Sequence, residues 1–240
     1  MKYVIRCMIG LLLIVWFYMG YLGWTWIPIG RRAKKGQIRV ACVGDSITYG
    51  AMIKNWYCYN WPHLMQKLLG KKYCVHNYGL SGHTGMETGD YPYVKTFRYR
   101  RSLCFAPDIV FLMFGTNDSK PQNWKGQEEF YQQYEKLLKS YLELPKKPAV
   151  YLMMPPAPHH MNGETANTYS FDIQLNEIQE AGKAVRKLAE NYGQSVIDLF
   201  SFTKNHPEWF VKDGIHPNAA GAGKIAELLA RELETGKRGG

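Results

Sequence analysis

The sequence has 240 residues, of which 46% are hydrophobic and 21% are charged. These are ordinary values for a packed globular protein, and they exclude a disordered chain, a collagen and a disulfide-stapled miniprotein. The net charge of +10, from 30 basic and 20 acidic residues, would suit a nucleic-acid-binding protein, so its distribution along the chain decides its meaning.

The excess charge is concentrated at the front of the chain. Residues 1–36 contain no acidic residue and six basic ones, which are Lys2, Arg6, Arg31, Arg32, Lys34 and Lys35. Without these six, residues 37–240 carry 24 basic and 20 acidic side chains, a net charge of only +4. We therefore expect no nucleic-acid partner.

The front charges flank an apolar segment, residues 7–30, that contains no charged side chain. As a helix it would extend about 36 Å, which is enough to cross a hydrocarbon core of about 30 Å. Aromatic residues gather in it, as at a membrane interface: Trp16, Tyr18, Tyr21, Trp24 and Trp26. We expect one N-terminal transmembrane helix that anchors the protein in a membrane. A cleaved signal peptide is the alternative, although no A-x-A-like cleavage site follows the segment.

The chain divides into four parts on this interpretation: an anchor or signal segment at 1–30, a basic linker at 31–37, one domain at 38–236 and a frayed tail at 237–240. Two basic residues precede the apolar segment and four follow it, which places the domain in the cytoplasm by the positive-inside rule. A short basic start before an apolar run is also typical of a secretory signal, so the two indications conflict.

The five cysteines do not resolve the compartment. They lack C-x-x-C spacing, so they predict neither a zinc site nor a full disulfide framework, although one pair could form a bridge. Cys42 and Cys74 fall within expected strands, where a thiol is usually a small buried hydrophobic group.

Strand and helix patterns alternate after the linker. Short apolar runs predict strands at 38–43, 73–78, 108–114, 149–154 and 195–200, and the spacing of apolar residues predicts helices at 61–69, 127–144, about 178–192 and about 225–233. This order predicts an α/β fold with a five-stranded parallel sheet covered on both faces. The stretch between 155 and 170 is expected to be irregular.

Polar or glycine-rich motifs follow the first three strands and precede the last helix: GDSIT at 44–48, NYGLSG at 77–82, GTND at 115–118 and DGIHP at 213–217. Ligands bind at the carboxyl ends of the strands in such sheets, so we expect these motifs to converge there. Taken singly, each motif could be a helix cap or an ordinary turn.

Together, the motifs supply the groups that acyl transfer needs. Ser46 would be the nucleophile, His216 its base, and Asp213 the acceptor that orients the imidazole. The backbone amides of Ser46 and Gly82 and the side-chain amide of Asn117 would stabilise an oxyanion.

The four motifs, in this order, resemble the sequence blocks of the SGNH (GDSL) hydrolase family over residues 38–233. The resemblance implies a flavodoxin-like three-layer sandwich, with Ser46, Asp213 and His216 as catalytic residues and Ser46, Gly82 and Asn117 as the oxyanion hole. The chain lacks the G-x-S-x-G motif of the larger α/β-hydrolases.

The resemblance implies a serine esterase that needs no cofactor and no metal. NYGLSG and the segment from GTND onward look most similar to carbohydrate O-acetylesterase-like members, so we expect removal of acetyl groups from a carbohydrate. The alternatives are a lysophospholipase or thioesterase acting on lipid, a glycan acyltransferase, and an inactive binding relative. A carbohydrate substrate favours an extracytoplasmic domain. The oligomeric state is not predicted.

Four further residues near the motifs are expected to contact substrate: Asp45, His83, Trp124 and Trp209. A set of basic residues follows the second motif and is expected to form a solvated face or to meet an anionic carbohydrate: Lys95, Arg98, Arg100 and Arg101. Adjacent His159 and His160 have no carboxylate spacing that would predict a metal site.

Overall fold

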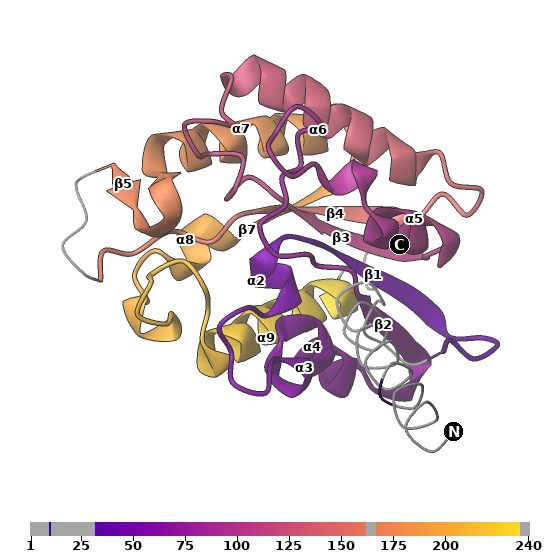
Figure 1. The fold of residues 1–240 in the computed structure, drawn as a ribbon. Helices are drawn as coiled ribbons and strands as arrows, with labels where there is room; N and C mark the ends of the chain where they lie inside the picture. The colour runs from indigo at the N-terminus through magenta and orange to yellow at the C-terminus, as the bar shows by residue number, and fades with distance from the viewer. Residues whose placement is uncertain (1–9, 11–31, 162–166, 236–240) are drawn as a thin grey trace, which may run out of the picture.

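The computed structural model describes residues 32–161 and 167–235, together with Gly10. One five-stranded parallel sheet runs through the domain in the order β2-β1-β3-β4-β7 (Figure 1). Its strands are β1 (Ile38–Gly44), β2 (Tyr73–Asn77), β3 (Ile109–Met113), β4 (Ala149–Met154) and β7 (Ser195–Asp198). The predicted parallel sheet is confirmed, and β1 and β3 lie at its centre.

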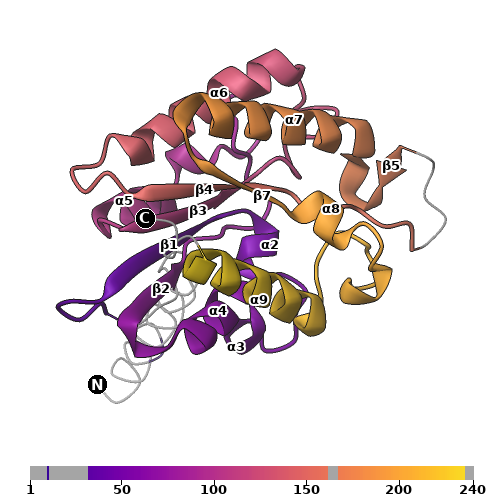
Figure 2. The same cartoon turned by 180° about the vertical axis from the view of Figure 1, so that it is seen from behind.

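Helices cover both faces of the sheet (Figures 1 and 2). One face carries α3 (Trp56–Tyr59), α4 (Trp61–Leu69) and α9 (Ala219–Thr235), and the other carries α5 (Phe97–Cys104), α6 (Gln127–Leu142) and α7 (Leu175–Tyr192). Two short helices, α2 (Ser46–Tyr49) and α8 (Leu199–Thr203), follow strands β1 and β7.

The alternation of side chains along β1 builds the two cores. Val40 and Cys42 join a cluster with α4 and α9, whereas Ala41 and Val43 join a second cluster with α6 and α7. Successive side chains of a strand point to opposite faces, so a strand buried on both sides is a continuous apolar run. The sequence IRVACVG of β1 has that character, which explains its central place.

The remaining elements are short. Four 3₁₀ turns span η1 (Gly70–Lys72), η2 (Tyr93–Lys95), η3 (Ser170–Asp172) and η4 (Pro207–Trp209). The strands β5 (Thr168–Tyr169) and β6 (Ile173–Gln174) pair antiparallel around η3. This hairpin lies in and just beyond the stretch that the sequence predicted to be irregular.

The fifth predicted strand, 195–200, is wrong at its end. The strand stops at Asp198 because the Asp198 side chain caps a helix: its Oδ1 accepts from the Ser201 amide at 2.9 Å. Helix α5 was not predicted, since its sequence FRYRRSLC holds three arginines and shows little apolar periodicity.

The predicted membrane span, residues 7–30, lies outside the described residues apart from Gly10. Within the described part of the chain, no helix is both long and apolar enough to cross a membrane. The anchor therefore stays a prediction. Cys42, Cys58, Cys74 and Cys104 are free thiols, and Cys42 and Cys74 are buried as expected.

The central strand makes a prediction about stability. Leu112 of β3 is 0% exposed in the cluster formed with α6 and α7. We expect Leu112→Ala to lower the free energy of unfolding by about 2–5 kcal/mol, because it removes buried methyl groups and leaves a cavity. Urea unfolding followed by circular dichroism measures this loss.

The matched control is Leu68→Ala on α4, where the leucine is 53% exposed. We expect this change to cost about 0.5 kcal/mol or less. Equal losses for the two variants would contradict the assignment of Leu112 to the core.

Candidate active site

The four motifs converge at the carboxyl ends of the central strands. Asp45 and Ser46 follow β1, Asn117 follows β3, and His216 stands shortly before α9. Parallel strands all end at the same edge of the sheet, so turns that are distant in sequence meet there. Figure 1 shows α2, which begins at Ser46, at this edge.

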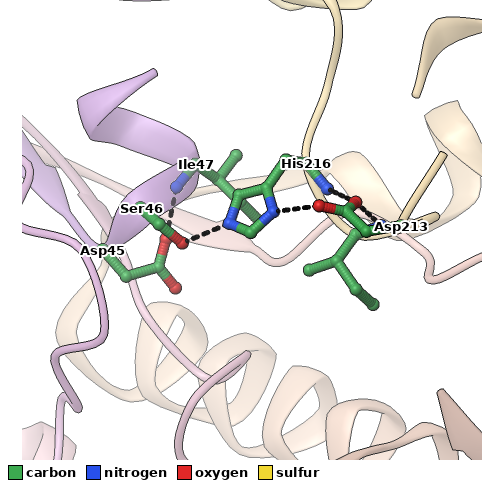
Figure 3. Close-up of polar contacts among 6 residues, drawn as sticks. Asp45, Ser46, Ile47, Asp213 and His216 are labelled. Atoms are coloured by element: carbon green, nitrogen blue, oxygen red, sulfur yellow. Dashed lines mark hydrogen bonds and ion pairs between the residues drawn. The ribbon is translucent and has the colours of Figure 1, made fainter. Parts of the chain in front are cut away.

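Ser46, His216 and Asp213 form a continuous hydrogen-bonded chain (Figure 3). The Oγ of Ser46 lies 2.8 Å from the Nε2 of His216, and the Nδ1 of His216 lies 2.7 Å from the Oδ2 of Asp213. A carboxylate only accepts, so Nδ1 carries the proton and the Nε2 lone pair faces the serine hydroxyl. Ser46 and His216 are both buried.

The carboxyl group of Asp213 is held in its ionised form. Burial alone would raise its pKa, but hydrogen bonds from the His216 ring and from the amides of His216 and Ile215 outweigh burial and lower the pKa below its ordinary value. Asp213 Oδ1 accepts from these two amides at 2.9 and 2.8 Å. The same carboxylate thus shapes the turn and orients the imidazole.

The loop after β4 contacts the turn that carries Asp213 and His216 and holds it in place. The amide of His159 donates to the Gly214 carbonyl at 2.9 Å, and the His159 ring packs on Phe210 with 4.5 Å between centroids. Gly214 has φ +69, and a Cβ there would collide with the His159 carbonyl oxygen. Only glycine fits this position without displacing the turn.

The predicted oxyanion donors lie on the loops after β1, β2 and β3. The amide of Ser46 opens α2 and has no carbonyl partner within that helix. Gly82 has φ +78, a conformation that favours glycine. The Nδ2 of Asn117 donates to the His83 carbonyl at 3.1 Å, which uses one of its two hydrogens and leaves the second.

Asp118 ties these loops together, a role that sequence reasoning missed. Its Oδ2 accepts from the amides of Gly115 at 3.0 Å and Gly85 at 3.1 Å, and its Oδ1 accepts from the Met86 amide at 2.8 Å. Complete burial raises its pKa to about 6, although the three amides act in the opposite direction. From the sequence, Asp118 could be interpreted only as a turn residue within the GTND motif.

Asn123 supports the same loop and was also missed. Its Nδ2 donates to the backbone carbonyl of Asn117 at 2.8 Å and to Asp90 at 3.0 Å. Asn123 is buried in a segment without apolar periodicity, so no sequence signal marked it. The backbone of Asn117 is therefore held from a second direction.

Of the four expected substrate contacts, His83 lies beside the predicted oxyanion donor Asn117, whose Nδ2 donates to the His83 carbonyl. Its Nδ1 lies 2.9 Å from the Ser81 carbonyl, and burial lowers its pKa, which favours the neutral ring. Trp124 is half-buried and packs on Phe130 at 5.8 Å.

Trp209 stacks on His206 with 3.7 Å between centroids, and it lines a surface hollow with Leu68 and residues of α9. Its expected contact with substrate stays a prediction.

Asp45 is 1% exposed and stands at the N-terminus of α2, so its expected contact with substrate stays a prediction. It caps α2, with Oδ1 accepting from the Ile47 amide at 2.9 Å (Figure 3). Burial raises the pKa of Asp45 to about 6, and the nearby charge of Asp118 adds to the rise.

Arg98 is also placed differently from expectation, because it is buried rather than part of a solvated face. Its Nη1 donates to the Gly79 carbonyl at 2.7 Å and its guanidinium lies over the Tyr49 ring. Arg98 therefore supports the loop that leads to Gly82. Lys95, Arg100 and Arg101 are exposed as predicted.

One aromatic residue beside the catalytic candidates was not foreseen. The ring of Phe171 lies edge-on to that of His216, with 5.7 Å between centroids. Phe171 lies in η3 with φ +63 and ψ +26, a left-handed conformation that costs a bulky residue about 1–3 kcal/mol. No pattern in the sequence distinguishes it. Across the described ranges, no three metal-ligating side chains gather into a metal site.

A comparison with known proteins identifies the family of the chain. The model of the GDSL-like Lipase/Acylhydrolase family matches residues 42–224. The chain is 35% identical over 220 residues to an acetylxylan esterase of Xylanibacter ruminicola, covering 88% of this chain and 46% of that protein. It is 25% identical over 242 residues to a multidomain esterase of Ruminococcus flavefaciens, covering 83% of this chain and 29% of that protein. The chain spans less than half the length of either relative.

Solved structures share the fold. Est24, a carbohydrate acetylesterase from Sinorhizobium meliloti, superposes with a TM-score of 0.68 at 21% identity, covering 83% of this chain and 99% of Est24. A putative arylesterase from Agrobacterium tumefaciens gives 0.67 at 22% identity, with the same two coverages. At these identities the likeness establishes the three-layer fold alone.

The buried carboxyl of Asp45 predicts a pH dependence of stability. Its pKa is about 6 in the folded protein, against an ordinary value of 3.8. The folded state therefore keeps a proton that the unfolded chain loses, and its advantage disappears as pH rises through about 6. Between about pH 4 and pH 7 we expect the unfolding free energy to fall by up to about 3 kcal/mol through this group.

The control is Asp45→Asn, which keeps an oxygen acceptor for the Ile47 amide but cannot ionise. Relative to the parent, this variant should gain stability as pH rises over that range, with the gap levelling off above about pH 6. Urea unfolding at four pH values measures both proteins. Parallel stability curves would contradict the raised pKa of Asp45.

Proposed function

Because the chain belongs to the GDSL-like lipase/acylhydrolase family, we propose that it is a serine esterase that removes acetyl groups from a carbohydrate through an acyl-enzyme on Ser46. The observation that carries the proposal is the hydrogen-bonded chain from Ser46 through His216 to Asp213, with separations of 2.8 and 2.7 Å. Nucleophile, base and orienting acid are already within the reach that such a mechanism needs.

In the first step, His216 Nε2 takes the hydroxyl proton as Ser46 Oγ forms a bond to the ester carbonyl carbon. Negative charge then develops on the carbonyl oxygen. The amides of Ser46 and Gly82 and the remaining Nδ2 hydrogen of Asn117 are the donors that we assign to this oxygen. When the tetrahedral intermediate collapses, the bond to the alcohol oxygen breaks and His216 returns the proton to the departing alcohol.

In the second step, water replaces the alcohol. His216 takes a proton from the water as its oxygen attacks the acyl-enzyme carbonyl, and the same donors hold the second oxyanion. The bond to Ser46 Oγ breaks, the serine recovers its proton from His216, and acetate leaves. Both steps use groups of this chain and water.

Asp213 acts in both steps without transferring a proton itself. The imidazole becomes positively charged each time it accepts a proton, and the ionised carboxylate at 2.7 Å stabilises that charge. The lowered pKa of Asp213 keeps the carboxylate charged across the range in which a neutral imidazole serves as base.

The carbohydrate part of the proposal is supported by the 35% identity to an acetylxylan esterase, which extends over 88% of this chain. An O-acetylated xylan is accordingly the substrate that we propose first. Hydrolysis of longer acyl chains, as in a lipid acyl hydrolase, is the competing activity that an ester panel separates.

The panel compares p-nitrophenyl acetate with p-nitrophenyl octanoate. We expect kcat/KM to be higher for the acetate, and we expect Ser46→Ala to lower it by at least about a thousandfold, because the nucleophile is lost. Ser140→Ala on α6 is the matched control, since its hydroxyl contacts only its own helix at the Leu137 carbonyl, and its activity should equal that of the parent.

Two outcomes contradict the proposal. A higher kcat/KM for the octanoate would favour a lipid acyl hydrolase, and activity retained in Ser46→Ala would remove the serine from its role. Circular dichroism of each variant verifies that the fold is unchanged.

A further inference from the structure

Phe171 is an exposed aromatic side chain in direct contact with the proposed catalytic base. It is 53% exposed, and its ring meets that of His216 at 76° with 5.7 Å between centroids. Both Phe171 and its neighbour Asp172 have positive φ, +63 and +61, in a conformation that side chains rarely adopt. Strain of this kind persists only where the surrounding structure enforces it.

The enforcing structure is a small third hydrophobic cluster. It joins Tyr169 and Ile173, which flank the 3₁₀ turn of Phe171, to Ile178 of α7 and to Ile215 of the catalytic turn. The amide of Gln174 also bonds to Ser119 Oγ at 3.3 Å. The β5–β6 hairpin therefore packs against the turn between Asp213 and His216, while the Phe171 side chain remains 53% exposed.

The position of Phe171 indicates which half of an ester it would meet. In the proposed mechanism, the carbonyl oxygen points to donors on the loops after β1, β2 and β3. The departing alcohol oxygen must instead approach His216 Nε2 to receive its proton. We therefore assign the side chain in contact with the His216 ring to the space of the alcohol rather than to that of the acyl oxygen.

We propose that Phe171 forms a stacking surface for the sugar ring that bears the ester, and thereby selects the alcohol half of the substrate. This inference rests on the proposed esterase function. The face of an aromatic ring carries negative charge density and attracts the positively polarised C–H groups of a pyranose. An exposed ring held rigidly on a hairpin offers that surface at little entropic cost.

The test compares two monoacetate esters that differ only in the alcohol: a methyl xyloside with a single O-acetyl group and methyl acetate. For Phe171→Ala and Phe171→Leu we expect kcat/KM on the xyloside to fall about tenfold, chiefly through KM, a change that corresponds to the loss of one modest contact. The kcat/KM of Phe171→Trp on the xyloside should stay within about threefold of the parent value. Methyl acetate should be hydrolysed equally by all four proteins.

Phe97→Ala is the matched control, because it removes another exposed phenylalanine, 44% accessible on α5. Its kinetics on both esters should equal those of the parent. Equal losses on both esters in Phe171→Ala would instead make Phe171 a residue that positions His216. Full activity of Phe171→Leu on the xyloside would also overturn stacking, since leucine is apolar but not aromatic.

Binding of xylotetraose, measured by calorimetry, separates this inference from the esterase proposal. We expect the parent to bind it and Phe171→Ala to bind it about tenfold more weakly. If the parent hydrolyses no ester but binds xylotetraose more tightly than Phe171→Ala does, the proposed esterase function is refuted and the stacking surface is supported. Hydrolysis or binding that is indifferent to Phe171 would refute the stacking surface alone, and a parent with neither activity would refute both.

Discussion

The hydrogen bond between His216 Nε2 and Ser46 Oγ joins residues 170 positions apart, and the organisation of the site depends on it. The parallel sheet supplies the coarse placement, because Ser46 stands two residues beyond the end of β1, a strand near the centre of the sheet. The fine placement comes from the turn before α9, whose backbone is held by Asp213 and by His159. A shift of about 1 Å in this turn would exceed the tolerance of a proton transfer, which explains why so many polar groups constrain it.

Two buried carboxyl groups contribute to that rigidity and lower the stability of the fold. Asp45 and Asp118 are almost fully buried, and burial raises the pKa of each to about 6. Asp118 accepts three amide hydrogens from two different loops, and Asp45 caps the helix that presents the nucleophile. Such groups lower stability near neutral pH yet fix the loops around the oxyanion donors. The left-handed backbone of Phe171 is likewise unfavourable locally, and the packing of a small hydrophobic cluster around it offsets the strain.

The sequence predicted the sheet, the layers and the convergence of four motifs because these follow from apolar runs and from residues next to strand ends. It did not predict α5, since the three arginines of this helix obscure its apolar periodicity and one of them, Arg98, is buried against Gly79. It did not predict the β5–β6 hairpin, whose strands have two residues each. Phe171 shows the same limit: which aromatic residue faces the site depends on tertiary packing that no local pattern encodes.

The central claim is that Ser46 is the nucleophile and that its Oγ carries the acyl group in the intermediate. Treatment with a fluorophosphonate probe, followed by intact-mass and peptide mass spectrometry, tests it most directly because the probe reacts with activated serines and needs no knowledge of the natural substrate. We predict one adduct per chain, located on Ser46 and absent from a His216→Ala variant, in which no base activates the hydroxyl. An unlabelled protein, or an adduct on another residue, would contradict the account.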